Sequence, residues 1–157
     1  MAHVEQSVEV NVPVSVAYNQ WTQFESFPQF MDGVKSVSQR DDTHLVWTAE
    51  IGGEERTWTA EITRQEPDRV IAWRSVEGKQ NDGRVTFDPI SAESCRVTAE
   101  FDIDTQGFKE SLGDALGFVD RRVKGDLEKF KDFIENRGTA SGAWRGQVEE
   151  GQQIRGG

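Results

Sequence analysis

The amphipathic stretch at residues 116–137 constrains the fold of this chain more than any other feature. Its apolar side chains recur at spacings of three and four, the period of an α-helix with 3.6 residues per turn. They are Leu116, Val119, Val123, Leu127, Phe130 and Ile134, and Phe133 widens the stripe. Charged residues occupy the other side. A helix of about six turns needs an apolar surface of similar length to cover, so the rest of the chain has to provide one.

Predicted strands provide that surface. Apolar and polar residues alternate from residue 4 to residue 12, which predicts a first strand closed by Pro13. From Gly33 to Ile103 the same period of two recurs between turn signals such as Gly52–Gly53 and Pro67–Asp68. The whole pattern predicts an antiparallel sheet of about six or seven strands with one apolar face.

Two short helices are expected between the first strand and the rest of the sheet. A short helical stripe of apolar residues starts after Pro13 and ends at Trp21. Pro28 interrupts the aromatic segment 24–31, so a second short helix follows the first. This order of elements predicts an α+β fold in which a curved sheet wraps around the long C-terminal helix. The two short helices would roof the space that remains between sheet and helix.

The length of 157 residues suits one domain, which the patterns above assign to residues 1–137. Gly138 follows the long helix and is expected to cap its C-terminus. Residues 138–157 are rich in glycine and poor in large apolar groups, a composition that predicts a flexible tail. The alternative for Trp144 is that it docks locally or onto a partner.

The charge of the chain disfavours two classes of partner. The formal net charge is −10, so no basic face is expected for nucleic-acid phosphates or for an anionic membrane surface. No stretch approaches the roughly 20 apolar residues of a membrane span, and the N-terminus does not resemble a signal peptide. We therefore expect a cytoplasmic protein that binds no nucleic acid and does not insert into membranes.

Residues that hold metals or cofactors are scarce. The two histidines, His3 and His44, and the single cysteine, Cys95, do not make an ordinary zinc site. The glycine motifs that bind phosphates or dinucleotides do not occur. Cys95 lies in a strand pattern, where a structural thiol is a better interpretation than a nucleophile. We expect neither a metal nor a cofactor.

Four segments carry a resemblance to a known family. They are residues 8–12 followed by Pro13, the aromatic–Pro–aromatic run from Trp21 to Val34, the segment GRVTF at 83–87, and the closing helix VKGDLEKFKDFIENR. Over about residues 3–137 the chain resembles the START-like, helix-grip (SRPBCC) superfamily, and within it the polyketide cyclase/dehydrase and coenzyme Q-binding group. The resemblance implies a deep apolar cavity between sheet and long helix that holds lipids, polyketides, quinones or other hydrophobic molecules. It also implies a tendency to form homodimers.

The interior is expected to be aromatic and to contact such a molecule. The ligand-binding candidates are Trp21, Phe27, Phe30, Met31, Trp47, Trp58, Trp73, Phe87, Phe101, Val123 and Leu127. Aromatic side chains offer a flat apolar ligand a large contact area and stacking geometry. Ordinary core packing is the alternative for each residue, and five tryptophans could fill the cavity rather than line it.

No catalytic set can be named from the sequence. A cyclisation needs a proton donor and acceptor near carbonyl oxygens, and family members are thought to use Arg, Tyr, Ser or His in the cavity. The inward parity of the strands leaves Arg56 and Ser75 as weak candidates, with Arg121 or Arg122 from the long helix. Tyr18, the only tyrosine, is a third weak candidate with a more plausible role in the core.

Three functions stay open on the sequence alone. The preferred hypothesis is the binding of a small hydrophobic molecule. A polyketide cyclase/dehydrase-like enzyme is the second, and a non-catalytic interaction or stress-related scaffold with a filled cavity is the third.

Overall fold

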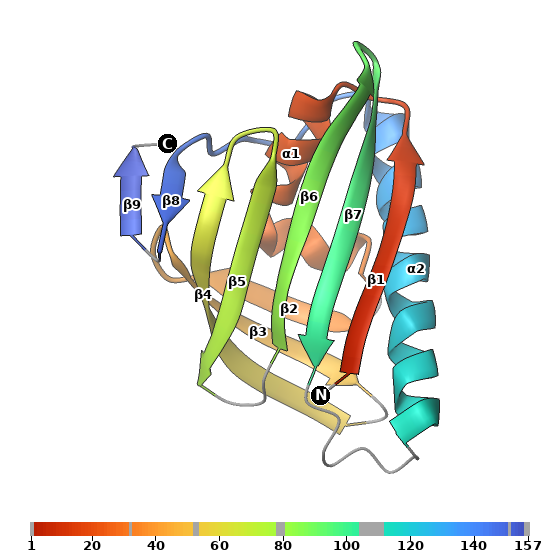
Figure 1. Cartoon of the computed structure of the whole chain (residues 1–157), viewed down its shortest axis with the longest axis vertical. Coiled ribbons are helices and arrows are strands. Elements are labelled where there is room, and N and C mark those ends of the chain that lie inside the picture. The colour runs from red at the N-terminus through yellow and green to blue at the C-terminus, as the bar shows by residue number, and fades with distance from the viewer. Residues whose placement is uncertain are drawn as a thin grey trace.

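A curved antiparallel sheet organises the chain (Figure 1). The computed structural model describes residues 2–31, 33–51, 54–77, 81–103, 112–150 and 152–155. The strands are β1 (Ala2–Val10), β2 (Val34–Gln39), β3 (His44–Ile51), β4 (Glu54–Glu66), β5 (Val70–Glu77), β6 (Asn81–Ser91) and β7 (Ser94–Ile103). Their order across the sheet is β1-β7-β6-β5-β4-β3-β2. Consecutive strands from β2 to β7 therefore pair with each other, and β1 pairs with β7. The predicted sheet is confirmed.

The two short helices follow β1 as the sequence predicts. They are α1 (Val14–Trp21) and the 3₁₀-helix η1 (Phe24–Gln29). The carbonyl oxygen of Pro13 accepts the first helical bonds of α1, and Pro28 lies inside η1, where the tighter helix tolerates it. Strand β1 ends at Val10, two residues earlier than the alternation predicted, because the chain bends at Asn11.

The long helix α2 (Leu112–Arg137) lies along β1 (Figure 1). Its stripe residues Leu127, Phe130 and Ile134 are buried, whereas the side chains of Leu116 and Val119 lie outside the described residues. On the β1 side, Lys131 Nζ donates to the carbonyl oxygen of Glu9 at 3.0 Å. The curved sheet with this helix against it gives the helix-grip α+β fold that the sequence predicts.

Strand β4 changes its inward face partway along its length. Trp58, Ala60 and Ile62 are buried on the inner face. The pairing of β4 with β5 shifts register between Ile62 and Arg64, and beyond this irregularity Gln65 is buried while Arg64 is exposed. A bulge of this kind inserts an extra residue and reverses the alternation that follows. The strand therefore presents both an apolar and a polar section to the interior.

The chain after α2 returns to the sheet. Gly138, with φ of +72°, donates to the carbonyl oxygen of Ile134 at 2.8 Å and caps α2 as predicted. Strand β8 (Gln147–Glu149) then pairs with β4, and β9 (Gln152–Arg155) pairs with β8 (Figure 1). Where the composition predicts a flexible tail, the structure places residues 139–150, called here the C-terminal strap, in specific contacts.

Those contacts join α1 to β4. Ser141 and Gln20 exchange two hydrogen bonds, of 2.8 Å and 3.0 Å, and the amide of Trp144 donates to Thr22 Oγ1 at 3.0 Å. Val148, opposite Gln65 in the pairing, is fully buried. Trp144 is thus docked locally. The sequence left this open as an alternative to a flexible tail, beside docking onto a partner.

Candidate functional site

Three tryptophans from adjacent strands form the aromatic part of the inner face. Trp47 of β3 lies directly opposite Trp58 of β4, and their rings are parallel within 6° with centroids 5.8 Å apart. Trp73 of β5 stacks on Trp47 at 6.2 Å. All three are at most 7% exposed. We call Trp47, Trp58 and Trp73 the tryptophan wall; it arises because inward positions of neighbouring antiparallel strands face one another.

Gly83 of β6 lets the wall lie close to the sheet. A Cβ at this position would come within 2.8 Å of Trp73 Cζ2 and of the Glu100 carbonyl oxygen, so only glycine leaves room for the ring. Phe101 of β7 then meets Trp73 edge-on at 5.6 Å. On the outer side of the sheet, Trp73 and Gly83 border a surface hollow of about 330 Å³.

The aromatic residues of the short helices form a second group. Trp21, Phe27 and Phe30 contact one another with centroid distances of 5.1 to 5.8 Å, and Phe130 of α2 packs against Trp21 and Phe30. Phe27 reaches Trp47 at 5.5 Å, which joins this group to the tryptophan wall. These rings are packed against one another as core residues are.

The remaining ligand-binding candidates are placed as follows. Met31 and Leu127 are buried in the core, and Phe101 and Val123 are partly buried against it. Phe87 lies apart from the wall, where it meets the ring of Tyr18 edge-on at 5.3 Å.

Arg56 and Ser75 lie on the same inner face as the wall. Arg56 is two residues before Trp58 on β4, is paired with Ala49 of β3, and is half-buried. Ser75 is paired with Ala60 on the other side of β4 and is also half-buried. Its amide donates to Asp82 Oδ1 at 2.9 Å. The structure therefore brings two of the three weak catalytic candidates near the tryptophans.

The long helix contributes a second arginine to this end of β4. The sequence left Arg121 and Arg122 open; Arg121 is exposed, and Arg122 turns toward the sheet. A Cβ built at Gly33 would overlap Nη1 of Arg122 and lie 3.0 Å from the carbonyl oxygen of Glu50. Because Glu50 follows Ala49, the partner of Arg56, both arginines approach the same edge of the interior.

Tyr18 is held at the opposite end of β4. Its side chain is fully buried, and burial raises the pKa of the hydroxyl to about 12, an effect that the nearby Gln65 amide opposes. Gln65 and Arg56 are nine positions apart on β4, up to about 30 Å in an extended strand. The structure therefore places Tyr18 and Arg56 at opposite ends of β4.

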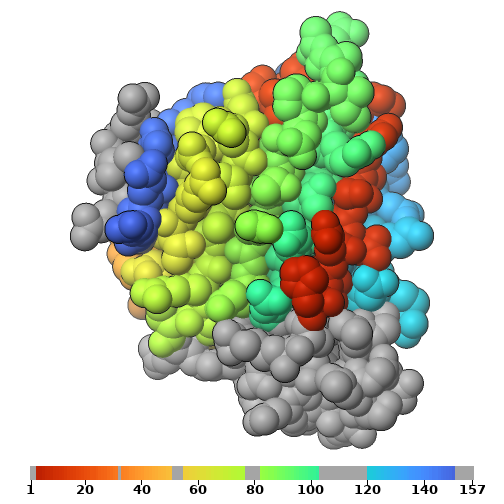
Figure 2. Space-filling model, viewed as in Figure 1, coloured from red at the N-terminus to blue at the C-terminus, as the bar shows by residue number. Residues whose placement is uncertain are grey.

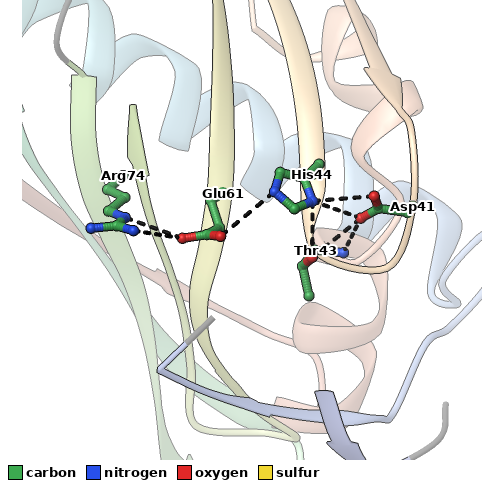
Figure 3. Close-up of polar contacts among 5 residues, drawn as sticks. All are labelled: Asp41, Thr43, His44, Glu61 and Arg74. Atoms are coloured by element: carbon green, nitrogen blue, oxygen red, sulfur yellow. Dashed lines mark hydrogen bonds and ion pairs between the residues drawn. The ribbon is translucent and has the colours of Figure 1, made fainter. Parts of the chain in front are cut away.

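The outer face of the sheet, which faces the viewer in Figure 2, carries ion pairs between neighbouring strands. In the one drawn in Figure 3, His44 Nδ1 contacts both Asp41 Oδ1 at 2.9 Å and Thr43 Oγ1 at 3.0 Å. His44 Nε2 faces Glu61 at 3.6 Å, and Glu61 pairs with Arg74 at 3.0 Å. Asp41 and the Thr43 hydroxyl share one ring nitrogen of His44, and the His44 side chain is 36% exposed, so the arrangement is that of a surface ion network.

Other chemistries find little support. Burial raises the pKa of Cys95 to about 11, so the thiol stays protonated near neutral pH, as expected for a structural cysteine. Among the described residues no group of three His, Cys, Asp or Glu side chains could hold a metal ion. Within the same residues, no helix combines the length and apolarity needed to cross a membrane.

Several residues that organise the interior were missed in the sequence. These residues are polar: Gln20 lies on a buried face of α1, Gln65 follows the bulge in β4, and Asp68 lies in the turn after β4. The Pro67–Asp68 turn was the one available signal, because the turn immediately follows Gln65 and Glu66. Strand β8 spans three residues, which is too short for any periodicity to predict.

A curved antiparallel sheet around a C-terminal helix, with two short helices after the first strand, defines the START-like class of helix-grip proteins. A family described as polyketide cyclase/dehydrase and lipid transport matches residues 10–132 of this chain. The chain belongs to that family.

Three similar proteins illustrate the match. An uncharacterised 17.2 kDa protein of Streptomyces lincolnensis is 49% identical over 94% of this chain and 99% of its own. The aromatase/cyclase ZhuI of Streptomyces sp. R1128 is 22% identical, with a TM-score of 0.69 over 90% of this chain and 98% of its own. A START superfamily protein of Mycobacterium smegmatis is 14% identical, with a TM-score of 0.75 over 86% of this chain and 98% of its own. The last two likenesses concern the fold alone.

Proposed function

We propose that this protein binds a small hydrophobic molecule with a flat ring system against the tryptophan wall. The observation that carries the proposal is the stack of Trp47, Trp58 and Trp73 on the inner face of the curved sheet. Flat aromatic surfaces favour offset stacking with another ring, and such contacts add to the gain from apolar burial. Membership of a family that includes lipid transport supports the same class of ligand.

The indole N–H groups of the wall add a polar requirement. Nε1 of Trp47 and of Trp58 is buried and has no hydrogen-bond partner among the described residues. A buried donor without an acceptor destabilises a protein by about 1–3 kcal/mol, so buried Trp N–H groups usually have partners. We therefore propose a ligand that carries an acceptor oxygen, such as a carbonyl or a phenol, beside its rings.

Arginine at the same end favours a second candidate function. Arg56 shares the inner face with Trp58, and Arg122 reaches the adjacent edge of the sheet from α2. A guanidinium beside a carbonyl oxygen stabilises the negative charge that develops in an enolate, the electrostatic help that an aldol cyclisation needs. A cyclase/dehydrase-like enzyme with Arg56 in this role is the alternative, and the aromatase/cyclase fold likeness agrees with it.

The ring contacts of Trp21, Phe27 and Phe30 support the third hypothesis, a scaffold with a filled interior. The ligand-binding proposal and the scaffold hypothesis differ in whether an apolar molecule enters the interior of the protein at all. A binding experiment on the intact chain decides between them.

The binding experiment is native mass spectrometry of freshly purified protein, followed by titration with a naphthoquinone while Trp fluorescence is recorded. We expect a co-purified hydrophobic molecule or saturable quenching. Trp58→Phe keeps an aromatic ring and removes the N–H, and should weaken quinone binding by about 3–10-fold, the value of one neutral hydrogen bond. Trp144→Phe in the C-terminal strap is the matched control and should bind like the parent.

Failure of the parent protein to carry or bind any apolar molecule would refute the ligand-binding proposal and leave the scaffold. The same mass spectra give the mass of the assembly and so test the homodimer that the resemblance implies.

The cyclase alternative needs its own test. Arg56→Ala should abolish most turnover of a reactive poly-β-keto substrate, whereas Arg74→Ala on the outer face should not. Equal turnover by the Arg56→Ala variant and the parent would remove Arg56 from the chemistry.

A further inference from the structure

Three polar side chains meet beneath the C-terminal strap at the end of β4. Tyr18 of α1 is fully buried, and Gln65 of β4 is 1% exposed. With Asp68 of the following turn they form what we call the polar cluster. Tyr18 Oη, both amide atoms of Gln65 and Asp68 Oδ1 are buried and have no hydrogen-bond partner in the part of the chain that the structure describes.

Local backbone geometry brings this cluster together. The register shift in β4 turns Gln65 into the interior. Asp68 adopts a φ of +63°, which a short polar side chain in a turn tolerates. The Gln65 amide lies close enough to the Tyr18 hydroxyl to lower its pKa as a hydrogen-bond partner does. The contact between them falls outside the usual distance and angle limits, so both groups remain unpaired.

The strap closes the cluster from outside. Arg145 pairs with Asp68 Oδ2 at 2.8 Å and donates to Asn19 Oδ1 at 2.6 Å. Its guanidinium carbon lies 5.6 Å from the centre of the Tyr18 ring, a cation–π arrangement. One strap residue thus covers α1 and the turn after β4 together.

The unpaired atoms are complementary to water. The Gln65 amide offers two donors and an acceptor, the Tyr18 hydroxyl offers a donor and an acceptor, and the Asp68 oxygen accepts. A direct Tyr18–Gln65 bond would leave Asp68 Oδ1 and the other amide atom of Gln65 unpaired. One water molecule donates twice and accepts twice, and buried waters typically make about three such bonds.

We infer that the polar cluster binds an ordered water molecule, enclosed by the C-terminal strap, that links α1, β4 and the turn at Asp68. This water site is independent of the tryptophan wall and of whatever the wall binds. It makes the Gln65 end of β4 a closed, hydrated part of the fold.

The direct test is a high-resolution crystal structure of the full chain. We expect a well-ordered water within about 2.6–3.2 Å of Gln65 and of at least one of Tyr18 Oη and Asp68 Oδ1. A cluster that contains no water, with Tyr18 bonded directly to Gln65, would overturn the inference.

Thermal unfolding of variants gives a second test. Tyr18→Phe and Gln65→Leu each remove partners of the water and should each lower Tm by about 2–6 °C. The double variant removes most of the demand for water, so its Tm should fall by clearly less than the sum of the single changes.

Strict additivity of the two changes would contradict a shared water. Gln39→Leu at an exposed position of β2 is the matched control and should leave Tm within about 2 °C of the parent. If Gln65→Leu does not fold, the crystal structure of the parent chain still decides the question.

Discussion

The two ends of strand β4 face the same interior and are built for different tasks. At the Arg56 end, the inward Trp58 stacks on Trp47 of β3, and Arg122 approaches from α2. At the Gln65 end, inward residues meet Tyr18, Asp68 and the C-terminal strap. One strand thus carries an aromatic surface suited to an apolar ligand and a polar surface suited to water.

The difference comes from one irregularity and one covering segment. The register shift between Ile62 and Arg64 places an amide where the alternation would place Arg64. Beyond β3, the edge of β4 at Arg64 and Gln65 is paired by β8. An uncovered sheet edge would leave backbone groups unpaired, so the strap completes the sheet where β3 no longer reaches.

Removal of the strap should have the largest effect. A chain that ends at Gly138 loses the burial of Val148, worth about 1.5–3 kcal/mol, and the hydrogen bonds of Ser141 to Gln20. We expect the free energy of unfolding to fall by about 3–5 kcal/mol and Tm by about 6–15 °C. Calorimetry of the truncated and full-length proteins measures this change.

A chain that ends at Glu150 keeps the strap and is the control, with a Tm near that of the parent. The tryptophan wall lies apart from the Gln65 end of β4 that the strap covers. We therefore expect the chain that ends at Gly138 still to bind naphthoquinone at a temperature where it is folded. Loss of binding in that folded variant would show that the two ends are coupled.

Much of the fold could be predicted because it rests on period and order. The stripe through Leu127, Phe130 and Ile134 and the alternation around Trp47 and Trp58 report burial directly, and the structure buries all five. The Pro13 and Pro28 positions marked the two short helices for steric reasons that act within a few residues.

The arrangement of the candidate site was harder to predict because it depends on contacts between distant segments. Parity placed Arg56 and Trp58 on one face, but it could not show that Tyr18 belongs to the other end of the strand. The strap was not predicted because a glycine-rich composition indicates only that segments of this kind are flexible on average. Its attachment rests on a few specific bonds, such as those of Gln20 and Thr22.

The ionisation of Tyr18 should have the second largest effect. Its pKa is raised to about 12 in the folded protein from an ordinary value of 10.0, because burial disfavours the phenolate. The stabilising contribution of the neutral hydroxyl is therefore complete below pH 10 and is lost as the pH rises toward 12. The loss amounts to about 2–3 kcal/mol.

Tyr18 is the only tyrosine, so the near-ultraviolet absorbance of tyrosinate reports this residue alone. We expect a midpoint near pH 12 in the parent chain and a lower one, closer to 10, in the chain that ends at Gly138. The Tyr18→Phe variant should lose less stability over this range. An unchanged midpoint after truncation would mean that the strap does not bury the hydroxyl.

The smallest effect concerns Arg122 at the other end of β4. Gly33→Ala would place a Cβ against Arg122 Nη1 and 3.0 Å from the Glu50 carbonyl oxygen, so the flexible arginine has to withdraw. We expect a loss of about 1–2 kcal/mol in the free energy of unfolding, measured in urea. In an Arg122→Ala background the guanidinium is absent, so Gly33→Ala should lower the free energy of unfolding by less than it does in the parent chain.

Gly125→Ala is the matched control, because a Cβ at that position on α2 meets no atom within 4 Å. It should stabilise the helix by up to about 1 kcal/mol, since alanine has the higher helix propensity. If the alanine at position 33 costs the same with and without Arg122, the guanidinium is not what limits the space there. In that case the Glu50 carbonyl alone requires glycine, and the Arg56 end of β4 has one arginine near its inner face rather than two.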